Sequence, residues 1–246
     1  MKKHVEMECL EAEITLGGQP ITYTIRRSLK AKNVRFVIRE ESGLEVVIPA
    51  DYPLKNIDVL LSQREKWILD KLKLMEENAQ IRQAAQDDAL SAIRYLGKEY
   101  PVVVILDHAS PIRVELSGEK ALLTLPQNRE EMLRQVIDAW YRWAAKSLFS
   151  ERAAYWAEKM HVTYQNLFIR NQKTRWGSCS KRKNLSFNMR IVMAPPEVVD
   201  YIIIHELAHL KEMNHSKKFW QVVETYCPDY KRHLAWLKKF GPGLTL

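Results

Sequence analysis

The segment 202–215 reads IIIHELAHLKEMNH and contains side chains whose types and spacing suit metal chemistry. His205, Glu206 and His209 match the pattern H-E-x-x-H, in which two imidazoles hold zinc and the glutamate acts as general base on a metal-activated water. Residues four apart on an α-helix lie ~40° apart around its axis and ~6 Å apart along it, so both imidazoles face one space. The alternative is a pair of core histidines bonded to carbonyls.

A third histidine, His215, follows ten residues after His205. Catalytic zinc commonly keeps three protein ligands and leaves a fourth position open, so three imidazoles are chemically sufficient. We expect the helix to end at Met213-Asn214, because Asn tolerates the left-handed conformation that turns a chain back. The alternative for His215 is an exposed residue at the start of the next helix, before Ser216.

The residues before the motif are apolar on nearly every side of the expected helix. They are Val198, Val199, Ile202, Ile203 and Ile204. Such a helix is buried rather than lying on a surface, and a buried helix holds its ligands rigidly. We therefore predict that the metal helix is a central element of its domain.

Other elements are expected to lie around this helix. A helical pattern over 129–160 predicts a long helix behind the site, and 167–172 and 185–194 read as paired strands beside it. Residues 194–196 form the corner before the metal helix. An edge strand at such a site offers backbone hydrogen bonds to an extended peptide.

The first half of the chain alternates short β-like runs with turns. Strands are predicted at 21–27, 34–40 and 44–50 in an antiparallel sheet, followed by an amphipathic helix over 54–77 and a polar linker over 80–89. Further strands over 94–106, 111–116 and 121–126 suggest a second, similar β module. We divide the chain into a β-rich N-terminal region with one amphipathic helix, 1–128, and a metal-dependent hydrolase domain, 129–246.

Composition limits the class of protein to which the chain can belong. With 246 residues, 46% hydrophobic and 28% charged, the chain is typical of a soluble globular protein. The N-terminus has acidic residues where a signal peptide has its apolar core, and no 18-residue apolar run occurs, so a cytoplasmic location with no membrane partner is the expectation. The three cysteines, Cys9, Cys179 and Cys227, are far apart and predict reduced thiols rather than a zinc knuckle.

The net charge of +8 favours anionic partners, including a nucleotide or nucleic acid. Basic residues gather on both sides of the metal helix, at 170, 173, 175 and 181–183 before it and at 211, 217, 218, 231, 232, 238 and 239 after it. The alternative is that these side chains form solvated faces that serve solubility.

Four pieces of the segment 171–220 also carry a resemblance to a known family: TRWGSCS at 174–180, LSFNMRIVMAPP at 185–196, HELAH at 205–209 and NHSKKFW at 214–220. Together they resemble the YgjP-like metal-dependent hydrolases, a branch of the zincin-type metallopeptidase fold. The resemblance implies an α+β fold with a zincin-like core, with the metal helix next to antiparallel strands. It also implies Zn²⁺ on His205, His209 and His215, Glu206 as general base, and a relationship to SprT-like DNA-repair proteases.

The leading interpretation is a zinc-dependent, metallopeptidase-like hydrolase that acts on a peptide or protein. Candidates for a second donor to a developing oxyanion are Arg175, Tyr201, Tyr226 and Tyr230. Two alternatives stay open: a metal-dependent nucleotide phosphohydrolase that acts on nucleoside triphosphates, and a DNA-associated zinc protein whose basic segments bind phosphate.

Overall fold

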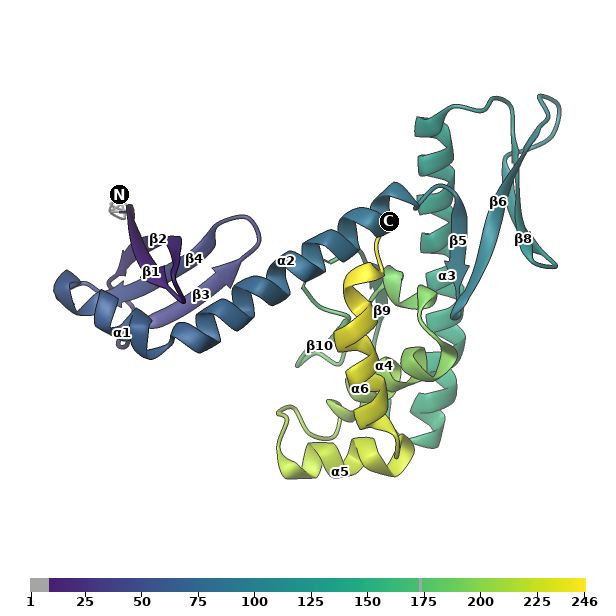
Figure 1. Cartoon of the computed structure of the whole chain (residues 1–246). Coiled ribbons are helices and arrows are strands. Elements are labelled where there is room, and N and C mark those ends of the chain that lie inside the picture. Colours follow the sequence, from purple (N-terminus) through teal and green to yellow (C-terminus); the bar gives the residue numbers. More distant parts are fainter. Residues whose placement is uncertain (1–8, 173) are drawn as a thin grey trace, which may run out of the picture. The chain divides into compact units, whose positions relative to one another are not determined.

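The computed structural model describes residues 9–172 and 174–246, and the chain forms two compact units that divide between Ile81 and Arg82 (Figure 1). Each unit has a hydrophobic core of its own. The core of the first lies within residues 16–68, and the core of the second lies within residues 93–244. The functional division into 1–128 and 129–246 stays a prediction.

The first unit contains a sheet with the strand order β1-β2-β4-β3. Its strands are β1 (Cys9–Leu16), β2 (Gln19–Ser28), β3 (Arg35–Arg39) and β4 (Gly43–Pro49). The strands predicted from sequence are confirmed, whereas the expectation of an antiparallel sheet is wrong for one pair, because β2 and β4 run parallel. The run LEVVI in β4 is buried throughout. A strand covered on both faces belongs in the middle of a sheet, which is where β4 lies.

Two helices follow this sheet after a short 3-10 turn, η1 (Leu54–Asn56). They are α1 (Ile57–Gln63) and α2 (Glu65–Asp87), and α1 contributes Leu61 and α2 contributes Ile68 to the core of the unit. The predicted linker over 80–89 is wrong, because α2 continues through most of it. The residues 79–87 are rich in Ala and Gln, which favour helix even where no apolar stripe is present.

The second unit begins with a sheet of the same design. Its strands are β5 (Ala92–Tyr95), β6 (Lys98–Leu106), β7 (Arg113–Ser117) and β8 (Lys120–Leu125). The order β5-β6-β8-β7 repeats that of the first sheet, and in both the central pair is parallel and the outer pairs are antiparallel. The prediction of two similar β modules is therefore confirmed at the level of topology.

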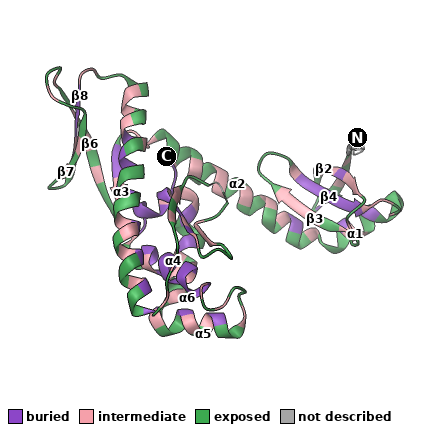
Figure 2. Cartoon of the chain, turned by 180° about the vertical axis from the view of Figure 1, so that it is seen from behind, coloured by how far each residue is buried: buried purple, intermediate pink, exposed green. Residues whose placement is uncertain are grey.

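The long helix α3 (Glu130–Lys159) confirms the helix predicted over 129–160. It packs on the metal helix, α4 (Pro196–Ala208), and on the 3-10 segment η2 (Met189–Met193) that precedes it. Arg152 of α3 pairs with Asp200 of α4, and the Phe149 ring stacks on Phe187 with 4.6 Å between centroids. The interior of this unit, including most of α4, is buried (Figure 2).

A turn of the β module also fixes the start of α4. Leu96 N donates to Val192 O at 2.7 Å, and Gly97 N donates to Met193 O at 3.2 Å. Gly97 has φ +77°, and a Cβ there would lie 3.2 Å from the Pro195 Cα, so the close approach favours glycine. The β5–β6 turn thus holds the segment from which the metal helix begins.

The remaining strands form a sheet in the order β10-β11-β9. They are β9 (Leu167–Arg170), β10 (Gly177–Cys179) and β11 (Leu185–Asn188), and two helices, α5 (Lys217–Tyr226) and α6 (Tyr230–Phe240), and a 3-10 turn, η3 (Gly241–Gly243), complete the unit. The predicted pairing of 167–172 with 185–194 is confirmed, but it is parallel, and the second strand ends at Asn188 where η2 begins.

The α+β class with a strand-rich N-terminal region is confirmed. None of the helices in the described part of the chain is long and apolar enough to cross a membrane. The cytoplasmic location stays a prediction.

Candidate metal centre

The metal helix α4 forms because its sequence suits the first turn of a helix and buries most of its length. Pro196 occupies the first turn, where a missing N–H costs nothing, and the apolar residues predicted to be buried are buried. The expected end at Met213-Asn214 is wrong, since the helix ends at Ala208 with His209 as its cap. Leu210 N and Lys211 N instead bond to the carbonyls of residues 207 and 208, and the turn uses no left-handed residue.

This early turn brings the three predicted histidines together. One ring nitrogen each of His205, His209 and His215 lies within 4.8 Å of the others. The Nε2 atoms of His205 and His215 are 3.1 Å apart. Two nitrogens that share a tetrahedral zinc at ~2.0–2.1 Å lie roughly 3.4 Å apart, so the separation of this pair is close to that expected for two ligands of one zinc ion.

The outer nitrogens of the rings are also informative. His209 Nδ1 lies 3.2 Å from the Glu212 carbonyl oxygen, a bond that requires Nδ1–H and leaves Nε2 with a free lone pair. His205 Nδ1 is buried and has no hydrogen-bond partner among the described residues. Burial lowers the pKa of His205 to about 3, with His209 and His215 adding to the effect, and burial also lowers the pKa of His209. Both rings are therefore neutral, the form that binds metals.

One phenyl ring supports all three imidazoles. The Phe219 ring centroid lies 4.9 Å from that of His205, 4.6 Å from that of His209 and 4.7 Å from that of His215. Phe219 is fully buried, and its N–H donates to the side chain of Ser216, which caps α5 at 3.4 Å. The segment NHSKKFW therefore supplies three features of the site. They are the candidate ligand His215, the helix cap Ser216 and the Phe219 ring that packs against the three imidazoles.

Glu206, next to His205 on α4, is only 5% exposed. Burial raises its pKa to about 8, and the positive charge of Arg175 opposes this rise. Strand β10 passes so close that a Cβ on Gly177 would lie 2.6 Å from Glu206 Oε1 and 2.7 Å from Cγ. The absence of a side chain at Gly177 is thus what makes room for the Glu206 carboxylate.

A cleft of about 400 Å³ opens beside Glu206 and His205. Its other lining residues are Arg175, Trp176, Gly177, Tyr201, Ile202, Leu234, Leu237 and Lys238. Of the four predicted oxyanion donors, the structure therefore brings Arg175 and Tyr201 to the cleft. Tyr226 instead packs against Lys211, whose Nζ lies 5.6 Å from the centroid of the Tyr226 ring. Tyr230 stacks on Trp220 with 5.1 Å between ring centroids.

The loop that carries Arg175 is tied to the sheet by one buried amide. Asn188 Nδ2 donates to Gln172 O at 2.6 Å and to Arg175 O at 3.0 Å, and its N–H donates to Trp176 O at 2.8 Å. Asn188 is 2% exposed. Because a buried amide that satisfies these carbonyls is costly to remove, Asn188 fixes the approach of Arg175 and Trp176 to the cleft.

Cys179 follows Gly177 on the same strand. Burial and the nearby Glu206 carboxylate raise the pKa of its thiol to about 11. A thiol that stays protonated near neutral pH is a poor nucleophile. Its position therefore favours a structural role.

Sequence reasoning singled out the histidines and Glu206 but missed Gly177, Asn188 and Phe219. All three lie within the motif segments TRWGSCS, LSFNMRIVMAPP and NHSKKFW. A glycine and an asparagine in strand-like runs were the available signals, since neither favours a strand interior.

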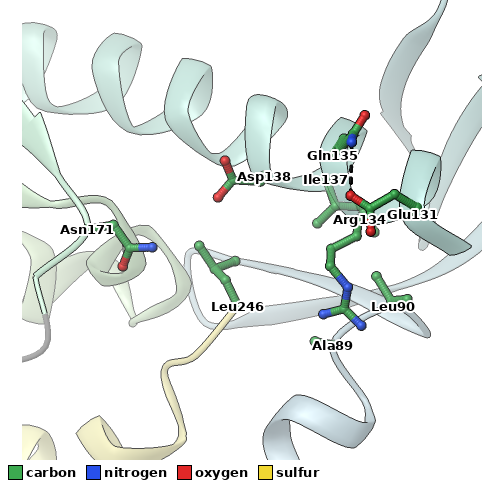
Figure 3. A pocket seen from close by; sticks show the side chains of 9 residues that line it. All are labelled: Ala89, Leu90, Glu131, Arg134, Gln135, Ile137, Asp138, Asn171 and Leu246. Atoms are coloured by element: carbon green, nitrogen blue, oxygen red, sulfur yellow. Dashed lines mark hydrogen bonds between the residues drawn. The ribbon is translucent and has the colours of Figure 1, made fainter.

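A second cavity, of about 320 Å³, lies along α3 (Figure 3). Its charged side chains already have partners one helical turn away: Arg134 with Glu130, Asp138 with Arg142, and Glu131 with Gln135. Its lining includes no histidine or cysteine among the described residues. The chemistry of the protein is therefore assigned to the histidine cluster and its cleft.

A family model described as YgjP-like, metallopeptidase domain, matches residues 32–240. A crystal structure of the metallopeptidase zymogen of Pyrococcus abyssi abylysin is 25% identical, with a TM-score of 0.35, and the match covers 37% of this chain and 94% of that chain. The corresponding zymogen of Methanocaldococcus jannaschii jannalysin is 26% identical, with a TM-score of 0.32, covering 36% and 94%. No curated protein matches the chain.

Proposed function

Because the chain belongs to the YgjP-like metallopeptidase family, we propose that it is a zinc-dependent hydrolase that cleaves peptide bonds, with His205, His209 and His215 as metal ligands and Glu206 as general base. The observation that carries the proposal is the convergence of three imidazoles beside a buried carboxylate, where His205 and Glu206 line a cleft. Imidazole nitrogens at these separations suit zinc, and a histidine set is what the cysteine-poor sequence offers.

A bound zinc ion supplies Lewis acidity, which lowers the pKa of water and polarises a carbonyl oxygen. Glu206 accepts the proton of the attacking water and passes it to the leaving amine nitrogen. Burial raises the pKa of Glu206 to about 8, and a cation bound at the neighbouring histidines would lower that pKa and favour the carboxylate that accepts a proton. Arg175 and Tyr201 line the cleft as the candidate donors to the developing oxyanion.

The position of β10 supports a peptide as the substrate. In the described sheet β10 lies at the edge, next to β11 on one side only, and it also contacts α4. An extended peptide can add to such an edge through backbone hydrogen bonds and reach the carboxylate of Glu206.

The test compares zinc-loaded wild type with Glu206→Gln on unfolded protein, nucleoside triphosphates and single-stranded DNA, with zinc content measured for both. We expect wild type to cleave protein, and Glu206→Gln to retain zinc and lose cleavage. His209→Ala should lose both. Release of phosphate or pyrophosphate from nucleotides without protein cleavage would reject the peptidase in favour of a phosphohydrolase, and equal turnover by Glu206→Gln would reject Glu206 as the base.

A further inference from the structure

The cleft beside Glu206 has two apolar walls that come from different helices. Tyr201 and Ile202 of α4 form one wall, and Leu234 and Leu237 of α6 form the other. Tyr201, Ile202 and Leu237 are buried in the protein, so this part of the lining is fixed by packing in the core. A volume of about 400 Å³ is enough to accept a large side chain and to remove it from water.

The open side of the same cleft is positively charged. Arg175 approaches from the segment before β10, and Lys238 approaches from the last turn of α6, and both are exposed. Glu206 is the acidic side chain in the described lining, and it is buried. A ligand that enters therefore meets two cations at the rim, and a carboxylate on the ligand is favoured there over an ammonium group.

We propose that the cleft selects peptides in which a large apolar side chain stands next to a carboxylate, with the apolar side chain between α4 and α6 and the carboxylate at Arg175 and Lys238. This inference rests on the proposed peptidase function, because that function makes the occupant of the cleft a substrate. The carboxylate has two sources, an acidic side chain adjacent in the peptide or the free C-terminus of the peptide.

The chain offers a matched pair of variants for the charge at the rim. Lys238→Glu reverses a charge that lines the cleft, whereas Lys239→Glu makes the same change one residue further along α6, at an exposed position outside the described lining. Both changes alter the net charge of the protein equally. A difference between them therefore reports the local field in the cleft.

The experiment measures binding to zinc-loaded Glu206→Gln protein and, in parallel, cleavage by wild type. The peptides differ at two adjacent positions and carry Leu-Asp, Leu-Lys or Ser-Asp. A further pair places Leu at the C-terminus, either as the free acid or as the amide. We expect Leu-Asp to bind about tenfold more tightly than either Leu-Lys or Ser-Asp. Preferential binding of the free acid over the amide would identify a terminal carboxylate as the source, and equal binding would identify the acidic side chain.

Introducing Lys238→Glu into the binding variant should abolish the preference for Leu-Asp over Leu-Lys, and introducing Lys239→Glu should leave it unchanged. Equal affinities for all peptides, or equal effects of the two charge reversals, would overturn the assignment of the cleft. Cleavage by wild type without peptide preference would reject this inference and uphold the peptidase. Selective binding without any cleavage by wild type would reject the peptidase and uphold the selectivity of the cleft.

Discussion

The close approach of β10 to Glu206 makes Gly177→Ala a sharp test of how the site is built. The backbone of Gly177 lies outside the left-handed region, so alanine causes no strain in the main chain. The added Cβ would nevertheless lie 2.6 Å from Oε1, 2.7 Å from Cγ and 2.8 Å from Cδ of Glu206. Carbon atoms in contact are normally ~3.5 Å or more apart, so the Glu206 side chain has to move by roughly 0.8 Å.

A displacement of this size should reduce the catalytic rate strongly and the stability of the fold only slightly. A shift of about 1 Å in a reacting group reduces rates by about 10²-fold, which is ~2.7 kcal/mol of transition-state free energy. By contrast, alanine restricts the unfolded chain and offsets part of the strain in the folded state. We therefore expect kcat/KM for a peptide substrate to fall about a hundredfold, with zinc content and thermal midpoint close to those of wild type.

The matched control is Ser178→Ala, one residue further along β10, where the side chain points to the opposite face of the strand. It should retain the activity of wild type. Full activity of zinc-loaded Gly177→Ala would refute the argument that this glycine makes room for a catalytic carboxylate, and loss of zinc would show that the perturbation reaches the metal ligands instead.

Three further predictions concern the supports of the fold and the site. Phe219→Ala should destabilise the second unit by about 3–5 kcal/mol and reduce zinc content, whereas Phe219→Leu should retain more of both, as measured by denaturant unfolding and metal analysis. Asn188→Ala should cost about 1–3 kcal/mol in unfolding free energy and raise KM through the Arg175 loop, while zinc content stays unchanged. In the first unit, burial raises the pKa of Glu45, but hydrogen bonds from two arginines outweigh it and hold that pKa below its ordinary value of 4.5. The stabilisation is therefore present above that value and is lost as the pH falls through the lower native pKa, so Glu45→Gln should weaken the loss of stability that urea titrations measure as the pH falls below 4.5.

The local elements were predictable wherever the hydrophobic pattern is strong. The stripe of α3 and the apolar run of α4 predict helices that the structure contains, because burial on these faces dominates their free energy. The end of α4 was predicted five residues late. No sequence rule indicated that the carbonyls of residues 207 and 208 would be satisfied by the next turn, with His209 as the cap.

Pairing between distant strands was harder to predict. The insertion of β4 between β2 and β3 depends on which strand is covered on both faces, a property of the packed sheet that the alternation of single strands does not reveal. The histidine cluster could be predicted from the sequence, because its three members lie close together within residues 205–215. The closeness of Gly177 and of the α6 wall to Glu206 could not be predicted, since they approach it from segments about 30 residues away on either side.

The same separation has a consequence for how members of such a lineage can diverge. The three histidines and the supporting Phe219 ring come from one short stretch of chain. By contrast, β10 and α6 contribute cleft residues next to Glu206 from distant parts of the sequence. We expect a descendant whose β10 acquires a side chain at the position of Gly177 to keep its metal and to lose most of its activity, so retention of the metal would be a poor guide to whether such a protein is still an enzyme.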